Sequence, residues 1–225
     1  FDVDGDFQVL LIDIEDASQY SEIERRRLSL QLQLYFEKIE CPYSFFWYDG
    51  YYVLIVNNLS QKVFYQLVES MYHRAKNRMR VSALHIGMGT QLKDIRELNL
   101  SYQRALSAVT FARMFQKNII CFDDMGIYQI LFSIQDQKIL SDMYHHLLDA
   151  LIQYDQKHNS ELEKTLYYYL KYDGSPQKIA RSTYTHRNTV HYRIEKIKTL
   201  LNCELATFEE KFPYMIAFYI AKMMK

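Results

Sequence analysis

Residues 175–201 read SPQKIARSTYTHRNTVHYRIEKIKTLL, and this stretch decides how the C-terminal part of the chain folds. Ser175 followed by Pro176 is typical of a helix start, because serine is a favoured N-cap and proline suits the first helical position. Ile179 and Ala180 supply the small apolar contact with which one helix crosses another closely. The stretch therefore predicts a short helix, a tight turn and a second helix, which together form a helix-turn-helix.

The second helix, which we expect to begin near Thr185 or His186, has one apolar face and one hydrogen-bonding face. Its apolar residues recur at spacings of four, three and four, which places them on one buried face. They are Val190, Ile194, Ile197 and Leu201. Most polar side chains of this helix, among them Glu195, lie opposite the apolar face or beside it. Those that we predict to contact DNA are Thr185, His186, Arg187, Asn188, Thr189, His191, Tyr192, Arg193 and Lys196.

These residue types suit the reading of a DNA groove. Asparagine can pair with adenine through two hydrogen bonds and arginine with guanine, while the first turn of such a helix offers free N–H groups to a phosphate. Asn188 lies nearly opposite Val190 on the helical wheel, so we predict that it reaches furthest into the major groove. The alternative is that Asn188 caps the helix start and carries no sequence information.

The same segment has a local excess of positive charge. Between residues 175 and 199 there are six lysines and arginines against Glu195 alone, whereas the whole chain has 27 basic and 27 acidic residues. Such a local excess is typical of a DNA-binding module, although a basic, solvated helical hairpin that binds nothing would share it. We predict phosphate contacts from Ser175, Gln177, Lys178 and Arg181.

A longer pattern surrounds the motif. It comprises Tyr154-Asp155, Glu161-Leu162, Thr165-Leu166, Tyr169-Leu170, Ile179-Ala180, His186-Arg187-Asn188-Thr189-Val190 and Tyr192-Arg193-Ile194. In order and spacing this pattern resembles the C-terminal helix-turn-helix of the PucR/CdaR transcriptional regulators. The family usually has aliphatic residues where Thr183 and Thr185 stand here, so the turn between the helices is less apolar than in the family.

Length and composition limit the protein class. The 225 residues are 49% hydrophobic and 24% charged, which allows one large or two modest globular domains and excludes a disordered chain. No apolar run approaches the roughly 20 residues of a membrane span, and no signal peptide is visible. Three widely separated cysteines without CxxC spacing suit a reducing cytosol. We expect a cytoplasmic protein, and the start at Phe1 suggests a piece of something longer.

The first half alternates strand and helix signals in the order βαββαβαβ. An apolar strand is predicted at 7–14, a capping box of Ser21 and Glu24 opens a helix, and Asp49-Gly50 joins two aromatic strands through a type I′ turn. A strand is predicted at 81–86 and another at 118–122. This order predicts an α/β (α+β) sandwich of the ferredoxin-like kind, followed by an all-α domain.

Ile86-Gly87-Met88-Gly89, followed by Ser101-Tyr102, Ala105 and Ala108, resembles the GGDEF-related domain found upstream of the same helix-turn-helix in CdaR-type regulators. Active diguanylate cyclases carry Gly-Gly-Asp/Glu-Glu-Phe at the central hairpin, where the carboxylate binds metal. This chain reads WYDGYY at 47–52, so the resemblance implies a degenerate domain without catalytic residues, metal or cofactor. Asp13 and Glu15 share one strand face, as a metal-binding pair would, but we interpret them as solvated strand-end carboxylates.

Three regions follow from these patterns. They are a GGDEF-like domain at 1–123, a helical connector at 124–159 and the helix-turn-helix domain at 160–225. His145 and His146 lie near Asp142 and Asp149, but adjacent histidines point 100° apart, so a polar helix face is favoured over a metal site. A last helix at 205–224 either covers the helix-turn-helix core or contacts a second copy.

The resemblance implies a sequence-specific, DNA-binding transcriptional regulator of catabolic genes that is not an enzyme. We expect it to bind double-stranded DNA as a homodimer, because one helix-turn-helix buries too little surface for regulatory affinity. A small-molecule effector would be sensed by a segment upstream of this chain. The alternative is a nucleotide-binding or nucleotide-cyclising signalling protein in which the GGDEF-like domain is active.

Overall fold

A computed structural model describes residues 5–15, 19–37, 39–78 and 83–224. The chain divides into two compact units, Phe1–Ser133 and Ile134–Lys225, each with its own core. This division falls within the region 124–159 that was predicted as a connector. The last helix of the first unit and the first helix of the second unit therefore share that region between them.

The first unit contains a five-stranded sheet in the order β2-β3-β1-β4-β5. Its strands are β1 (Phe7–Ile14), β2 (Tyr43–Tyr48), β3 (Tyr51–Asn57), β4 (Leu84–Met88) and β5 (Ile119–Cys121). All neighbours are antiparallel except β4 and β5, which are parallel. The first four strands have the ferredoxin-like order, so the predicted fold class is confirmed. The predicted strand at 81–86 begins later than expected, and residues 81 and 82 lie outside the described residues.

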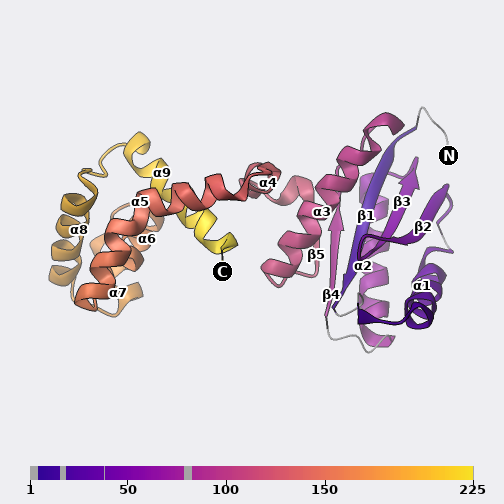
Figure 1. Ribbon diagram of the computed structural model, residues 1–225, viewed down its shortest axis with the longest axis horizontal. Coiled ribbons are helices and arrows are strands. Elements are labelled where there is room, and N and C mark those ends of the chain that lie inside the picture. The colour runs from indigo at the N-terminus through magenta and orange to yellow at the C-terminus, as the bar shows by residue number, and fades with distance from the viewer. Residues whose placement is uncertain (1–4, 16–18, 38, 79–82, 225) are drawn as a thin grey trace. The chain divides into compact units, whose positions relative to one another are not determined.

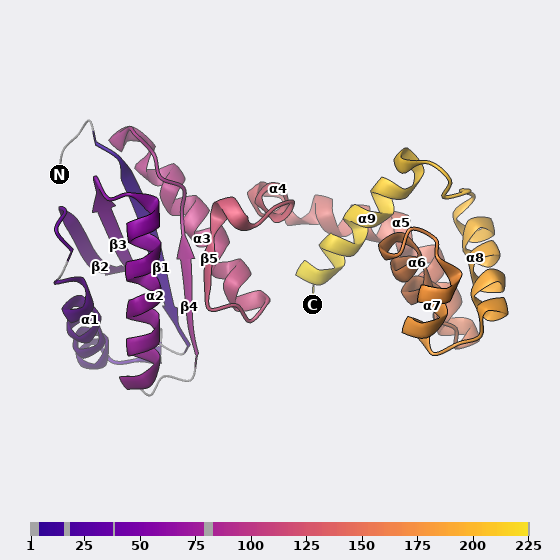
Figure 2. The ribbon, with the colours of Figure 1, turned by 180° about the vertical axis from the view of Figure 1, so that it is seen from behind.

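Helices cover both faces of this sheet (Figures 1 and 2). The helices α1 (Glu22–Phe36) and α2 (Gln61–Arg78) pack on one face, and α3 (Leu98–Met114) packs on the other. The central strand β1 is buried along its whole length, so its alternating side chains serve two cores. Leu10 and Ile12 contact the layer of α1 and α2, whereas Val9 and Leu11 contact α3.

Two local sequence signals act in the structure as predicted. The Ser21 hydroxyl accepts the Glu24 N–H and the Glu24 carboxylate accepts the Ser21 N–H, which completes the capping box of α1. Asp49 and Gly50 join β2 to β3 with φ angles of +49° and +85°. Positive φ at both residues is what a type I′ hairpin turn requires.

Gly87 and Gly89 allow α3 to lie close against β4. A Cβ atom at Gly87 would stand 2.2 Å from the Val109 nitrogen, and one at Gly89 would stand 2.1 Å from the Ser101 carbonyl oxygen. Both contacts are with backbone, which cannot move aside without moving the helix. The glycines of this segment therefore set the distance between the helix and the sheet.

The first unit ends with short helices, and the second unit is helical throughout its described part. The first unit adds η2 (Ile95–Glu97), η3 (Phe122–Asp124) and α4 (Tyr128–Ser133). The second unit consists of α5 (Gln137–His158), α6 (Leu162–Lys171), α7 (Pro176–Thr183), α8 (Arg187–Leu201) and α9 (Phe208–Met223). Leu148 and Leu151 of α5 belong to the same core as Ile179, Val190 and Phe218. The helix α5 is thus part of the helical unit itself.

Candidate nucleic-acid interface

The predicted helix-turn-helix is formed by α7 and α8. Pro176 occupies the first helical position of α7, and Ser175 is its N-cap residue, although the serine side chain makes no capping hydrogen bond. The helix ends at Thr183, its C-cap residue Tyr184 has φ +53°, and the Thr185 N–H donates to the Ala180 carbonyl at 3.0 Å. The left-handed residue reverses the chain and directs it into α8.

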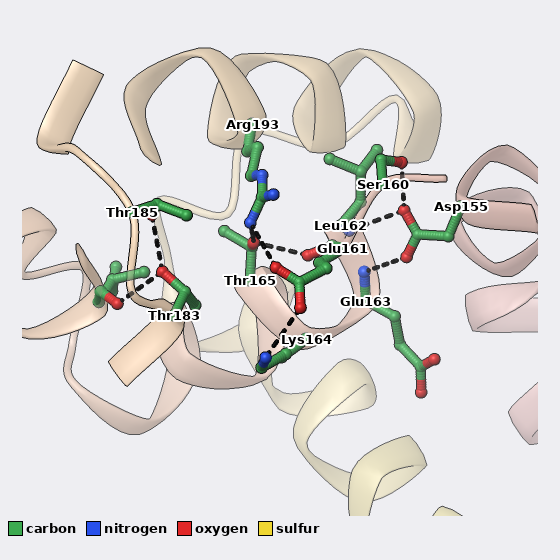
Figure 3. Close-up of polar contacts among 11 residues, drawn as sticks. Asp155, Ser160, Glu161, Leu162, Glu163, Lys164, Thr165, Thr183, Thr185 and Arg193 are labelled. Atoms are coloured by element: carbon green, nitrogen blue, oxygen red, sulfur yellow. Dashed lines mark hydrogen bonds and ion pairs between the residues drawn. The ribbon is translucent and has the colours of Figure 1, made fainter. Parts of the chain in front are cut away.

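The two threonines of the turn satisfy each other. Thr183 is buried, and its hydroxyl donates to the Ile179 carbonyl at 2.9 Å. The hydroxyl of Thr185 lies 2.8 Å from that of Thr183 (Figure 3). Since Thr183 has one hydroxyl proton, Thr185 donates the proton in this second bond. Polar residues are accommodated at these positions because each buried oxygen has a partner.

The start of α8 is capped by a histidine. The helix begins at Arg187, and His186 Nδ1 accepts the Asn188 N–H at 3.3 Å. The Asn188 side chain is not used for capping, and it is exposed in the first turn. The alternative role of Asn188 as the N-cap of this helix is therefore excluded.

The two faces of α8 separate as the helical wheel predicts. Val190, Ile194 and Ile197 are buried in the core of the unit, and Leu201 is partly buried. Opposite them lies an outer face of exposed side chains. We call it the α8 outer face, and it comprises Arg187, Asn188, Thr189, His191, Tyr192 and Glu195. Arg187, Asn188 and His191 present donors and acceptors there, whereas Glu195 is paired with Lys198.

Arg193, which the sequence placed among the DNA contacts, is turned toward α6. Its side chain is 15% exposed, and its guanidinium donates to the Glu161 carboxylate at 3.2 Å and to the Thr165 hydroxyl at 3.4 Å (Figure 3). Lys164 donates to the other Glu161 oxygen at 2.8 Å. These hydrogen bonds, that of Lys164 above all, lower the pKa of the Glu161 carboxyl. This network fixes the second helix of the motif to α6.

The helix α6 is itself held by α5. One oxygen of the Asp155 carboxylate accepts the Ser160 hydroxyl at 2.5 Å and the Leu162 N–H at 2.7 Å, and the other accepts the Glu163 N–H at 3.0 Å (Figure 3). Asp155 therefore caps α6 from the preceding helix, which satisfies N–H groups that a helix start leaves free. The series α5, α6 and α8 is joined by polar contacts as well as by the apolar core.

Some lysines of the helix-turn-helix already interact with other groups of the protein, which leaves fewer of them to contact DNA. Lys198 forms ion pairs with Glu195 at 3.3 Å and Glu204 at 3.4 Å. The ammonium group of Lys196 lies 5.0 Å from the centre of the Tyr154 ring. By contrast, the predicted phosphate contacts Gln177, Lys178 and Arg181 are exposed on α7, and Ser175 is half-buried at its start. Lys178, Arg181 and Arg187 have no carboxylate within ion-pairing distance among the described residues.

Tyr184, which was not among the predicted DNA contacts, is exposed beside the α8 outer face. Its side chain is 94% exposed, and its backbone is left-handed, which is costly for a residue with a Cβ. It lies between α7 and α8, beside the first turn of α8. The signal in the sequence was the aromatic residue inside the predicted turn, where glycine would have been expected.

A second polar site lies in the first unit, at the end of β1. A cleft of about 550 Å³ is lined by Asp13, Glu15 and Asp49, together with His85 and Arg113. The Arg113 guanidinium lies 3.5 Å from the Asp13 carboxylate. Burial raises the pKa of the Asp13 carboxyl, and the charges of Arg113 and His85 partly oppose this.

No group of three metal-binding side chains occurs among the residues that the structure describes. Of the histidines considered on α5, His145 forms a hydrogen bond with Asp149 at 2.8 Å on an exposed face. None of the described helices combines the length and apolar character that crossing a membrane requires.

Comparison with known families assigns both units. Residues 162–220 match the PucR C-terminal helix-turn-helix domain, and residues 1–111 match the GGDEF-like domain. Two relatives come from Bacillus subtilis (strain 168). The DNA-binding transcriptional activator AdeR is 27% identical over 65% of this chain and 36% of its own length. The proline-responsive transcriptional activator PutR is 29% identical over 57% of this chain and 32% of its own length.

The chain thus spans about a third of the length of these two relatives. Among solved structures, the crystal structure of a regulator of polyketide synthase expression from Bifidobacterium adolescentis matches 98% of this chain and 87% of its own. The sequence identity is 13% and the TM-score is 0.35.

Proposed function

We infer that this chain, which belongs to the PucR family by its helix-turn-helix and GGDEF-like domains, is the DNA-binding part of a transcriptional regulator. The observation that carries the proposal is the α8 outer face. It presents Asn188, Arg187 and His191 on a helix whose opposite side is fixed in the core. A helix of this kind fits the major groove, where its exposed side chains meet base edges.

The contacts of α7 complete the proposed DNA interface. Lys178 and Arg181 are exposed on the first helix of the motif, the helix that crosses the backbone of DNA in helix-turn-helix complexes. They would meet phosphates, which fix register and carry no sequence information. Arg193 has a positioning role in this proposal, because its guanidinium holds α8 against α6.

We propose that the working unit is a cytoplasmic homodimer that reads two half-sites about one helical turn apart. The regulated genes would serve the catabolism of a small metabolite, in line with the proline response in the name of PutR. The effector would be sensed by a part of the protein outside this chain, which covers about a third of its relatives.

The GGDEF-like domain has no enzymatic role in this proposal. Cyclisation of a nucleoside triphosphate needs a metal ion held by carboxylates. At Asp13 the neighbouring cation is a guanidinium that belongs to the protein, and the hairpin turn holds Asp49 and Gly50 in place of the cyclase motif. The competing function, nucleotide binding or cyclisation in the cleft at Asp13, is kept as the second arm of the test.

The test combines a DNA arm and a nucleotide arm on the same preparation. Footprinting on the promoter region beside its own gene should protect two half-sites, and incubation with GTP and Mg²⁺ or Mn²⁺ should yield no cyclic dinucleotide by chromatography. Protection of a single half-site, with a monomer in sedimentation, would contradict the homodimer. Absence of specific DNA binding together with GTP turnover that Asp13→Asn abolishes would replace the proposal by the competing function.

A further inference from the structure

The helical unit contains an apolar cleft that lies between α6 and α9, apart from the residues assigned to DNA. Its volume is about 230 Å³. The helix α6 contributes Tyr167 and Lys171 to its walls, and α9 contributes Met215, Phe218, Tyr219 and Lys222. On both helices the apolar residues and the lysine are three or four positions apart, which places them on one helix face.

The walls of the cleft are aromatic. The rings of Tyr167 and Phe218 meet edge to face, with centroids 5.4 Å apart and planes inclined at 73°. Phe218 is buried, so this ring pair forms a fixed apolar floor rather than a mobile surface.

Two lysines lie near the Tyr167 ring, and each also lies near a second ring, Lys171 near Tyr172 at 5.7 Å and Lys222 near Tyr219 at 5.5 Å. Lys171 Nζ lies 5.8 Å and Lys222 Nζ 5.7 Å from the centre of the same Tyr167 ring. Neither lysine has a carboxylate within ion-pairing distance in the described part of the chain. Both lysines line the cleft, so an anion bound in it would be stabilised by two positive charges.

We propose that this cleft binds a small organic acid with a flat or branched apolar body, its carboxylate between Lys171 and Lys222 and its body on Phe218. The volume lies below the roughly 300 Å³ at which sites for drug-sized ligands begin, so the ligand is of the size of benzoate and not of a nucleotide. The site is independent of the DNA interface and stands whether or not the proposed function holds.

The test titrates benzoate into the full chain and follows the Met215 methyl group by NMR, with isothermal titration in parallel. Saturable binding of benzoate is expected. Benzamide has the same shape without the charge. Its affinity should be at least about tenfold lower than that of benzoate, because it loses both ammonium contacts. The Met215 signal is assigned from Met215→Leu.

Charge-removing variants locate the site. Lys171→Met and Lys222→Met keep the length of each side chain, and each should weaken benzoate binding about three- to fivefold. Lys138→Met, at an exposed lysine of α5 outside the cleft, is the matched control and should leave it unchanged. Equal affinity for benzamide, or unchanged binding in both cleft variants, would overturn the proposal. So would a Met215 shift that depends on protein concentration alone, because a second copy would then occupy the cleft.

Discussion

The side chain of Asn188 is exposed in the first turn of α8 and is not needed to cap that helix, since His186 already accepts the Asn188 N–H. Asn188→Ala should therefore weaken binding to the specific site by about 1–3 kcal/mol and leave random DNA and thermal stability nearly unchanged. Gel-shift titrations on both DNAs measure the difference.

His186→Ala is the comparison for stability, because it removes the cap and should lower the free energy of unfolding by about 1 kcal/mol, which Asn188→Ala should not. If Asn188→Ala keeps its preference for the specific site, base reading belongs to Arg187 or His191 instead.

Arg193 and Arg187 lie on the same helix but differ in their surroundings, so variants of the two can be compared directly. Arg193→Met should destabilise the helical unit by on the order of 1–3 kcal/mol, because Glu161 and Thr165 lose a charged hydrogen-bond donor. Arg187→Met should leave thermal stability within about 0.5 kcal/mol and weaken DNA binding directly. Melting curves of both variants decide the matter, and an Arg193 variant of unchanged stability but lost DNA affinity would make Arg193 a DNA contact.

At this scale the sequence predicts one class of residue well. The helical wheel identified the exposure of Asn188 and His191, because exposure on an amphipathic helix follows from local spacing. Arg193 was also predicted as a DNA contact, because spacing within one helix carries no information about α6. The partner of Arg193 is Glu161, which lies 32 residues earlier in the chain.

Among the elements, the turn between α7 and α8 combines strain with exposure at Tyr184. Tyr184→Gly should raise the stability of the helical unit by about 1 kcal/mol, because glycine adopts a positive φ without the steric cost. The same change should weaken DNA binding, since strain of this kind persists where a side chain is used. Denaturant titration and gel shifts give the two quantities.

Tyr184→Ala separates the two effects. Alanine keeps the Cβ and hence the strain but removes the ring, so DNA binding should fall as it does in Tyr184→Gly without the gain in stability. If both variants bind DNA as the wild type does, the exposed ring has no part in the interface.

The start of α6 gives a pH dependence whose sign follows from Glu161. The lowered pKa of this carboxyl means that its stabilising effect is present above its ordinary pKa of 4.5 and is lost as pH falls through the lowered value. The melting temperatures of the wild type and of Glu161→Gln should therefore converge between about pH 5 and pH 3. NMR signals of α6 to α8 report the melting of this unit. A difference that grows on acidification would contradict the ion pairs.

For the whole molecule, the distribution of charge predicts how DNA binding responds to salt. The affinity should fall with a log–log slope of about −0.9 for each phosphate neutralised. Arg181→Gln should reduce the slope by about that amount for each protomer, because Arg181 is exposed and unpaired among the described residues.

Lys198→Gln is the control, because Lys198 already pairs with Glu195 and Glu204. It should leave the slope unchanged. A flat salt dependence in the wild type would count against any nucleic-acid partner.

Element order and turn chemistry predicted both units of the fold. The apolar and aromatic strand patterns, the capping box of α1 and the Asp49-Gly50 turn are local signals, and the structure contains each of them. The cleft at Asp13 was not predictable in the same way, because the approach of Arg113 depends on how closely α3 lies on the sheet. That distance is set by Gly87 and Gly89, whose role becomes visible once the helix above them is placed.

The central position of β1 also has a consequence for folding during synthesis on the ribosome. Its eight residues, FQVLLIDI, are made before their partners, which lie near Asn57 and Met88, and the Val9 N–H donates to the Ser101 hydroxyl 92 positions later. Contacts so distant form late and slow folding. Until β4 has been synthesised, the apolar strand β1 is exposed to chaperones and to neighbouring nascent chains. In the helical unit, by contrast, contacts such as that of the Asp155 carboxylate with the Leu162 N–H join residues seven positions apart, so they can form soon after synthesis.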